Sequence, residues 1–363
     1  MNWKNFQEQG YTLTEAEIKT LYPDIVRSYQ KARKSINEAI KTQYLKYLSS
    51  VDTDKYMNEM IKYDRLTALE HQISSDFITA SREVEKLTVQ ATRIGFSNNY
   101  YRSVYASQWL APEYAMTVLP PALIEIATLG TVDAWKKYTK KMIKDFGEQG
   151  YYQSQIGTLK DLLHKNRVRE LAQIKETIVQ GLVRGESYTA MSRGVSDVIG
   201  FSVYKDGVQT FSGAMANAMR IVSTESNRVM NDAAFANSKQ LEAQGIDVKK
   251  IWISVKDSRT RNTHAQLDGK IKTLDAYFMI GNDRALKPGG FGKVGNNARC
   301  RCGIGDIIND EPPTIMRGRK PVYKKDGTLD KTKGENEILD YKPFTQWADD
   351  VGLKWDKAGV IVA

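Results

Sequence analysis

Apolar residues recur every three or four positions through the first part of the chain, a spacing that predicts long amphipathic helices between residues 12 and 110. Thr14 followed by Glu17 has the spacing of a capping box, so we expect a helix to begin at Thr14. Pro23 stands early enough to be a first-turn kink instead of a helix end. The apolar face of this first helical stretch consists of Ile18, Leu21, Ile25, Tyr29, Ile36, Ile40 and Tyr44.

A second helical stretch is expected to begin near Asp54, with a break at Asn98-Asn99-Tyr100-Tyr101. After Leu119-Pro120-Pro121, helices are expected to resume over residues 122–147 and again over residues 155–181.

The pattern changes from Ile174 onward, where shorter elements follow one another. Gly185 is placed to end a short helix, and Ser187 is placed to cap the next one. Asp206-Gly207 predicts a hairpin, and a long helix is expected from Ser212 to about Ala243.

The β-branched, apolar stretch from Val248 to Val255 predicts a strand, and the chain is turn-rich from there to Asp306. We therefore expect a mainly α fold, in which a helical N-terminal half precedes a smaller α+β C-terminal domain and an extended tail. The expected boundaries are residues 1–170, 171–311 and 312–363, with a docking end in the tail at Phe344 and Trp347.

Composition excludes several classes of protein. With 41% hydrophobic and 26% charged residues the chain can bury a sizeable core. The sequence contains no run of eighteen apolar residues, so no membrane span is predicted. The N-terminus lacks the apolar segment of a secretory signal, so we expect assembly in the cytoplasm. Two cysteines one residue apart, Cys300 and Cys302, are too few and too badly placed for a disulfide scaffold.

A net charge of +10 suggests contact with a polyanion, nucleic acid first. Basic residues concentrate in two stretches, and each is either a solvated helix face or loop or a contact surface for nucleic acid or a protein partner. The two stretches consist of Lys136, Lys137, Lys140, Lys141 and Lys144, and of Arg317, Arg319, Lys320, Lys324 and Lys325.

Glu225 falls on the apolar stripe of the long helix that starts at Ser212. Because burying an unpaired carboxylate is costly, this position predicts a basic partner. Asp257 and Arg259 follow the strand directly; Asp257 suits an Asx turn, and Arg259 can present a bidentate fork to Glu225. We interpret the three residues as a structural clamp and not as a catalytic acid or base, because no nucleophile or second positioned base accompanies them.

His264, Cys300 and Cys302 are one imidazole and two thiols, which together are a plausible set of zinc ligands. An aspartate or a water molecule would complete four-coordination. The alternative is that the chain binds no cofactor and that the cysteines are small buried apolar residues.

The order of these features resembles one family, the Mu F-like phage head morphogenesis domain of minor capsid proteins. The resemblance covers about residues 170–307. It rests on Arg220, Thr224, Glu225, Asn231, Ala233, Gly245, Trp252, Asp257, Arg259, Thr260, His264, Leu267, Asp268, Gly269, Phe278, Pro288, Cys300, Arg301 and Cys302. Many members have Cys-x-x-Cys at the positions of Arg261 and His264, and a histidine at the position of Asn297, so only three likely ligands survive in this chain.

The resemblance implies a minor capsid protein of a tailed phage, without enzymatic activity. It would be built into the procapsid near the portal and would lie inside the virion. The portal protein is the implied partner; scaffold protein, major capsid protein and non-specifically bound phage DNA are further candidates, and a membrane is not.

An enzyme is the rival interpretation, because some proteins that carry this module resemble toxins with nuclease or ADP-ribosyltransferase domains. Arg220, Ser223-Thr224 and Glu225 have the residue types of a transferase, but they crowd into one predicted helix instead of lying on separate strands. For a nuclease the chain offers His264, Asp257 and Asp268, which form no complete catalytic constellation. A non-specific DNA-binding protein is the third alternative, although no base-reading motif is present.

Overall fold

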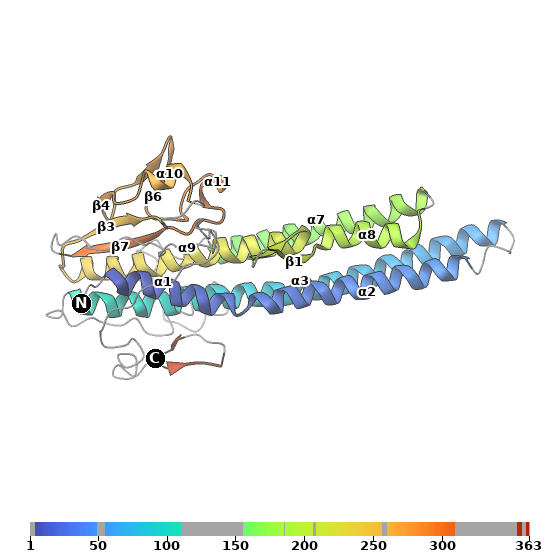
Figure 1. Cartoon of the computed structure of the whole chain (residues 1–363), viewed down its shortest axis with the longest axis horizontal. Helices are drawn as coiled ribbons and strands as arrows, with labels where there is room; N and C mark the ends of the chain where they lie inside the picture. The colour runs from blue at the N-terminus through green and yellow to red at the C-terminus, as the bar shows by residue number, and fades with distance from the viewer. Residues whose placement is uncertain are drawn as a thin grey trace, which may run out of the picture. The chain divides into compact units, whose positions relative to one another are not determined.

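The computed structural model of the chain is mainly helical, as expected, with a helical N-terminal half, further helices beyond it and small strands from Ser202 onward (Figure 1). It describes residues 4–48, 55–110, 155–184, 186–205, 208–255, 260–308, 354–357 and 361–362. The helices are α1 (Lys4–Lys19), α2 (Tyr22–Leu48), α3 (Lys55–Leu110), α7 (Gln155–Val183), α8 (Tyr188–Ile199), α9 (Gly213–Ala243), α10 (Asn262–Ala265) and α11 (Val294–Asn297). The strands are β1 (Ser202–Lys205), β2 (Val208–Phe211), β3 (Val248–Ile253), β4 (Ile271–Thr273), β5 (Phe278–Ile280), β6 (Asp283–Ala285), β7 (Gly303–Ile308), β8 (Lys354–Trp355) and β9 (Ile361–Val362).

The chain divides into two compact units, each built from separate segments of the sequence. The first unit comprises residues 1–20, 89–156 and 220–363, and the second comprises residues 21–88 and 157–219. Helices α3 and α9 each contribute residues to both units. The compact units are not consecutive along the chain and so do not coincide with the consecutive domains expected from the sequence. Those domain boundaries stay a prediction.

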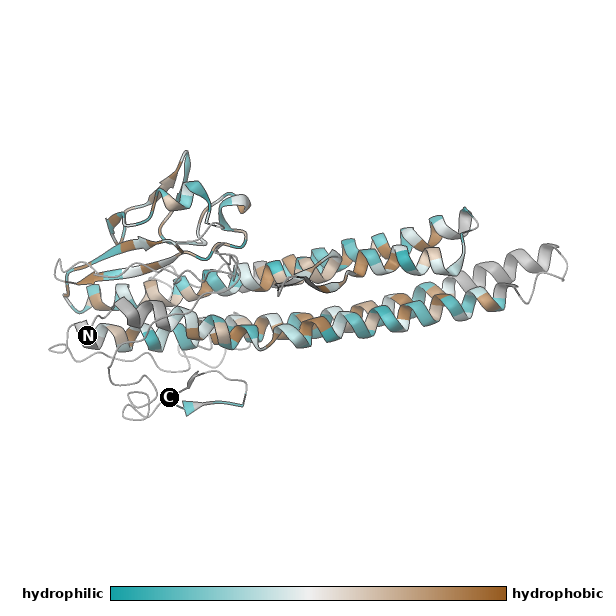
Figure 2. Ribbon diagram, viewed as in Figure 1, coloured by the Kyte–Doolittle hydropathy of each residue, from teal (hydrophilic) through white to brown (hydrophobic). Residues whose placement is uncertain are grey.

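The second unit is a set of helices packed through the apolar faces that the periodicity predicts (Figure 2). Ile25, Ile36 and Ile40 of α2 are buried, as expected, and Tyr29 packs against Phe77 of α3. Polar groups at the helix edges pair across the interfaces. The amide of Asn37, for example, donates to Ser196 Oγ of α8 at 3.2 Å. No helix among the described residues is long and apolar enough to cross a membrane.

The hairpin predicted around Asp206-Gly207 is confirmed as the antiparallel pair β1–β2, in which Lys205 lies opposite Val208. The hairpin connects α8 to α9, and both helix ends carry a glycine with positive φ: Gly200 at +100° and Gly213 at +56°. A Cβ on Gly200 would come within 1.9 Å of the Ser212 carbonyl oxygen, so only glycine fits where the two ends of the hairpin meet. The predicted cap of α8 is also confirmed, because Ser187 Oγ accepts from the Ala190 N–H.

The helix break predicted at Asn98-Asn99-Tyr100-Tyr101 is wrong, because α3 runs without interruption to Leu110. These polar side chains have tertiary partners in place of the local backbone bonds that would favour a turn. Asn99 donates to the Met230 carbonyl oxygen of α9 at 2.7 Å, and the Tyr100 hydroxyl donates to Gln240 at 2.6 Å. A few residues earlier Gly95 allows a close approach, since a Cβ there would lie 2.9 Å from Val229 Cγ2.

The helix start predicted at Thr14 is also wrong, since Thr14 lies inside α1 and is buried. The two residues of the expected capping box instead bind one arginine of α3. Thr14 Oγ1 accepts from Arg102 at 2.5 Å, and the Glu17 carboxylate forms a bidentate pair with the same guanidinium at 2.7 and 3.0 Å. The continuous helix expected around Pro23 is divided, because α1 ends at Lys19 and Pro23 lies in the first turn of α2.

A three-stranded antiparallel sheet of order β4–β3–β7 packs against α9 in the first unit (Figure 1). The predicted long helix and the predicted strand are confirmed as α9 and β3. Asn231 of α9 joins helix to sheet: its Oδ1 accepts from the Ile304 N–H at 3.0 Å, and its Nδ2 donates to the Cys302 carbonyl oxygen at 3.0 Å. The Tyr11 hydroxyl of α1 donates to the same Oδ1 at 3.1 Å. One buried amide therefore joins α1, α9 and β7.

Lys250 lies on the buried face of β3 and is completely buried. Its ammonium donates to the Leu274 carbonyl oxygen at 2.6 Å and lies 4.9 Å from the centre of the Phe235 ring. Burial, with a smaller contribution from the positive charge of Lys239, lowers the pKa of Lys250 to about 7.

Replacing Asn231 should destabilise the first unit strongly. In Asn231→Ala the Ile304 N–H, the Tyr11 hydroxyl and part of the bonding to the Cys302 carbonyl lose their partner in a buried position, at a cost of about 3 kcal/mol in the free energy of unfolding. Urea unfolding of both proteins measures the difference. Asn262→Ala, at an exposed position of α10, is the control and should change stability by less than about 0.5 kcal/mol. Equal effects of the two substitutions would contradict the role given to Asn231.

Lys250 should make stability depend on pH in the alkaline range. Between pH 7 and about 10 the unfolded lysine binds a proton. The folded one, whose pKa is about 7, does not, so the free energy of unfolding rises with pH over this window. Lys250→Met lacks this contribution, so its stability relative to the parent should be highest below pH 7 and should decline toward pH 10. Urea unfolding at pH 6, 8 and 9.5 tests this, and a pH-independent difference would refute it.

Candidate metal centre

His264, Cys300 and Cys302 come from two segments that the sheet brings together. His264 belongs to the short helix α10, which follows β3, and the two cysteines lie in the segment that leads into β7, the strand paired with β3. Ser254 fixes α10 against the end of β3, since its hydroxyl donates to the His264 carbonyl oxygen at 2.8 Å and accepts from Trp252 Nε1 at 3.1 Å.

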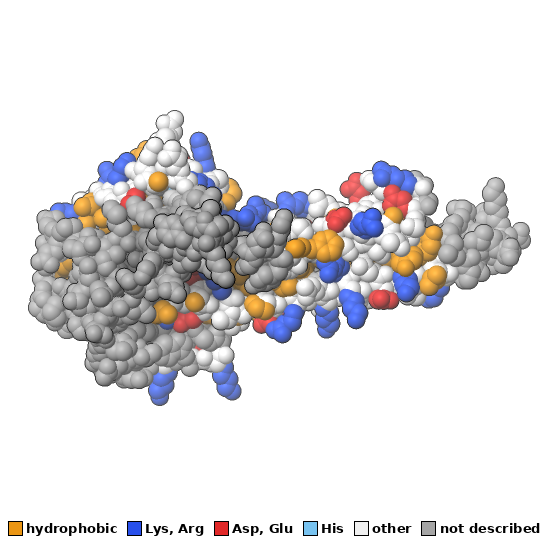
Figure 3. Space-filling view, in the orientation of Figure 1, with side chains coloured by type: hydrophobic (Ala, Val, Ile, Leu, Met, Phe, Trp, Pro, Cys, Tyr) orange, Lys and Arg blue, Asp and Glu red, His pale blue; other side chains and the backbone are white. Residues whose placement is uncertain are grey.

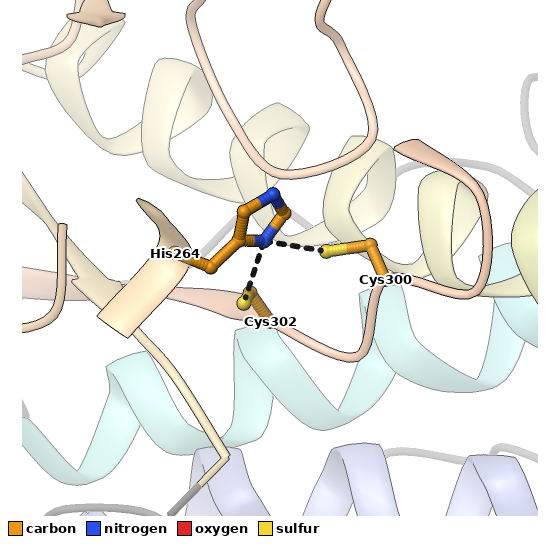
Figure 4. Close-up of side chains that lie close together, drawn as sticks. All are labelled: His264, Cys300 and Cys302. Carbon is orange, nitrogen blue, oxygen red and sulfur yellow. Dashed lines mark hydrogen bonds between the residues drawn. The ribbon is translucent and has the colours of Figure 1, made fainter. Parts of the chain in front are cut away.

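The three side chains converge on one point (Figure 4). His264 Nδ1 lies 3.4 Å from Cys302 Sγ and 3.5 Å from Cys300 Sγ, and the three donor atoms all lie within 4.8 Å of one another. All three residues are buried, and both cysteines are free thiols. The structure thus brings together the three residues that the sequence suggested as metal ligands.

The two thiols differ in pKa. Hydrogen bonding from Cys300, together with that from His264 and Ser254, lowers the pKa of Cys302 to about 5 in spite of its burial. The same interaction between the thiols, and then burial, raise the pKa of Cys300 well above its usual value. The pKa values of the two thiols are therefore shifted in opposite directions, that of Cys302 downward and that of Cys300 upward.

Aromatic rings enclose the site. The Trp252 ring packs edge-on against the His264 ring with centroids 5.8 Å apart, and the Phe291 ring lies 6.2 Å from it. His264 Nε2 is buried and has no hydrogen-bond partner. An apolar enclosure of this kind keeps water out and strengthens electrostatic interactions within it.

The donor set fits a tetrahedral zinc ion. Zn–S bonds of about 2.3 Å and Zn–N bonds of about 2.0 Å at the tetrahedral angle put sulfur and nitrogen roughly 3.5 Å apart. The two observed separations from His264 Nδ1 are 3.4 and 3.5 Å. Among the described residues these three side chains form the candidate ligand group. Asp268, an aspartate that could have been the fourth ligand, accepts a hydrogen bond from the Ser254 N–H at 2.7 Å.

Arg261 and Asn297, the two positions at which the family resemblance implies further ligands, form hydrogen bonds instead. Arg261 donates to the Ala298 carbonyl oxygen, and Asn297 exchanges two hydrogen bonds with the backbone of Phe291, at 3.0 and 2.5 Å. All three bonds close the same loop in front of Cys300. Arg299, in the left-handed region at φ 53°, is held there by its N–H bond to Thr224 Oγ1 of α9 at 2.9 Å.

Glu225 is largely buried and pairs with a base, as its position predicts, but the base is Arg228 of the same helix, at 2.8 Å. Asp257 and Arg259, the other two members of the predicted clamp, lie outside the described residues. Arg228 also pairs with Asp232 at 2.8 Å, and Asp232 pairs with Lys287 of the loop after β6.

Arg228, Asp232 and Lys287 were not predicted from the sequence as members of this site. Glu225, Arg228 and Asp232 alternate in charge at spacings of three and four on one helix, a signal that could have been found. Lys287 has no comparable signal, because it lies in the loop after β6, far from Asp232 in the sequence. The partners keep the pKa of Asp232 below its usual value despite burial: Lys287 contributes most and Arg228 next.

The two basic stretches singled out in the sequence lie outside the described residues. This applies to Lys136, Lys137, Lys140, Lys141 and Lys144, and to Arg317, Arg319, Lys320, Lys324 and Lys325. Arg220, Ser223, Thr224 and Glu225, the residue types of a transferase, all lie on α9.

Comparison with known proteins gives two curated relatives. The minor head protein GP7 of Bacillus phage SPP1 is 25% identical over 319 residues, which make up 86% of this chain and 87% of that protein. The NAD(+)–arginine ADP-ribosyltransferase EFV of Enterococcus faecalis is 29% identical over 182 residues, which make up 50% of this chain but only 32% of the enzyme. No solved structure matches the chain.

The family model described as phage Mu protein F like protein matches residues 172–304. This range contains α8, α9, the sheet strand β3 and all three residues of the candidate metal centre, and it agrees with the resemblance found in the sequence. Over residues 172–304 the chain is similar to the phage Mu protein F-like family, which confirms the resemblance found in the sequence.

Proposed function

We propose that this chain is a minor head protein of a tailed bacteriophage, incorporated into the procapsid near the portal and retained in the virion. The observation that carries the proposal is the extent of the similarity to the SPP1 minor head protein, 86% of this chain and 87% of that one. Such an extent includes helices outside the family domain, so the similarity is not confined to a module that other proteins could borrow.

The charge of the chain supports two kinds of contact in this setting. A net charge of +10 suits a protein close to packaged DNA, whose phosphates attract lysine and arginine without regard to sequence. The helical part offers a long surface for the portal protein, with scaffold and major capsid proteins as further partners. DNA contact would be salt-dependent, whereas docking on the portal through apolar surface would not.

The assembly role predicts that the chain co-purifies with the portal protein encoded beside it when the two are expressed together. The complex should persist in 0.5 M salt and should show a fixed stoichiometry by native mass spectrometry. As a control, the major tail protein of the same phage should not be retained. Absence of a complex at both low and moderate salt would contradict docking on the portal.

The match to the ADP-ribosyltransferase favours one rival function, a toxin-like enzyme. About two thirds of that enzyme lies outside the matched segment, and the described residues hold no complete catalytic constellation. Labelled NAD+ incubated with the purified chain and an arginine-rich protein distinguishes the two functions. If the parent transfers the label and Glu225→Gln does not, the result supports an enzyme. If the parent transfers no label, the result supports the structural role.

We also propose that His264, Cys300 and Cys302 hold a structural zinc ion. A bound zinc ion would cross-link α10 to the start of β7 and neutralise the thiolates that burial makes costly. The geometry supports this, because both sulfur atoms approach the same imidazole nitrogen at distances suited to a tetrahedral ion. Asp268 is engaged elsewhere, so water is the expected fourth ligand.

The zinc proposal predicts about one equivalent of zinc per chain by elemental analysis of protein prepared without added metal. A chelator should lower the Tm of the parent but leave that of Cys300→Ser/Cys302→Ser unchanged, because the variant has lost its metal already. Asn262→Ala, near the site but directed to solvent, should respond as the parent does. If the parent contains no zinc and the chelator does not change its Tm, the zinc proposal is wrong, and hydrogen bonds alone join the three side chains.

A further inference from the structure

The β5–β6 hairpin carries large apolar side chains on its solvent face. Side chains alternate along β5, so that Phe278 is buried while Tyr277 and Met279 are 42% and 51% exposed. Arg284 of β6 lies opposite Met279 in the register and stacks over the Tyr277 ring at 4.8 Å. This face is therefore apolar and basic at once.

The strand before the hairpin extends the same character. In β4 every residue is exposed, including Ile271 at 46%, and β4 forms an edge of the three-stranded sheet. Lys270 and Lys272 flank Ile271 and are exposed on the other side of this edge strand, where Lys272 lies opposite Lys250 of β3. Figure 3 shows hydrophobic and basic side chains close together over this projecting part of the first unit. We call this surface the hairpin face; its members are Lys270, Ile271, Lys272, Tyr277, Met279 and Arg284.

One acidic group is exposed in the connection between β4 and β5, and it is already paired. Asp275 accepts a hydrogen bond from Lys239 of α9 at 2.7 Å. Exposed apolar residues that are grouped together and surrounded by charged residues often mark a contact surface. A ligand for the hairpin face should therefore be acidic and should carry apolar or aromatic side chains.

A segment of the chain itself has this composition. Residues 335–351 contain five acidic residues and one lysine, interleaved with apolar and aromatic ones. The acidic residues are Glu335, Glu337, Asp340, Asp349 and Asp350. The apolar and aromatic ones include Ile338, Leu339, Tyr341, Phe344 and Trp347.

The sheet register shows that this segment can reach the hairpin face. Thr273 at the end of β4 lies opposite Lys249 of β3, which lies opposite Ile307 of β7. Two strand spacings, about 10 Å, therefore separate the end of β7 from the end of β4. Residues 309–334 follow β7, and the maximum reach of a chain of that length, on the order of 90 Å, far exceeds this separation. Binding within one chain would thus proceed at a high effective concentration.

We propose that residues 335–351 dock on the hairpin face of the same chain. The acidic residues meet Lys270, Lys272 and Arg284, and the aromatic residues cover Ile271, Tyr277 and Met279. The contact is independent of the assembly role and of any metal. It gives the segment after β7 a defined binding surface on the folded domain.

Photo-crosslinking of the full-length chain tests the proposal. Benzoylphenylalanine replaces Met279 in one variant and Val203 of β1 in a control, since the two side chains are equally exposed at 51% and 52%. After irradiation, peptide mass spectrometry should locate adducts of the Met279 variant within residues 335–351, and none from position 203. Mixing isotopically light and heavy protein before irradiation distinguishes adducts within a chain from those between chains.

Charge reversal supplies the second arm. Lys272→Glu/Arg284→Glu in the Met279 crosslinking variant should reduce the adduct yield by about tenfold, because like charges then face each other. Lys31→Glu/Lys41→Glu, two exposed residues of α2 with the same change in net charge, should leave the yield unchanged. Adducts elsewhere in the chain, adducts between chains, or a yield indifferent to the reversal would each overturn docking within the chain.

Discussion

The amide of Asn231 is the interaction on which the packing of the sheet against α9 depends most directly. Strand β7 must lie against α9 with its backbone groups satisfied, and a helix has no spare backbone donors or acceptors in its middle to offer. Asn231 provides both from one side chain, accepting from Ile304 and donating to the Cys302 carbonyl. Because the bond falls at Cys302 itself, the same contact that seats the strand also sets the position of a thiol beside His264. Fold and site are therefore specified together.

Buried charge secures the other side of the same helix. Glu225, Arg228, Asp232 and Lys287 alternate in sign, so that each charge removed from water has an opposite charge beside it. The network fastens the loop after β6 to α9, while Asn297 and Arg261 close the later part of that loop around the thiols. Lys250 is the exception, since it meets a carbonyl oxygen and two aromatic rings, and its lowered pKa reflects that environment.

Local signals were enough to predict the elements whose boundaries are set locally. The cap at Ser187, the hairpin at Asp206-Gly207 and the apolar run of β3 all depend on neighbours in sequence, and the structure confirms them. Elsewhere tertiary contacts override the local signals, and the predictions based on those signals are wrong. Asn99 was predicted to break the helix, but its side chain donates to the Met230 carbonyl oxygen and α3 continues. Thr14 was predicted to cap a helix, but its hydroxyl accepts from Arg102 instead. At the site, residue type alone singled out His264 and the two cysteines, whereas Lys287 could not be linked to Asp232 without the fold.

The β1–β2 hairpin leaves and rejoins the helical framework at almost the same point. The Phe201 N–H donates to Ser212 Oγ at 2.9 Å, and the Ser212 N–H donates to the Phe201 carbonyl oxygen at 3.0 Å, so the two ends are bonded to each other. Whatever length of chain lies between them, α8 and α9 need not move to accommodate it. The hairpin is thus a position where natural variants can gain or lose sequence, and where an epitope tag or fluorescent label can be inserted without disturbing the helices on either side.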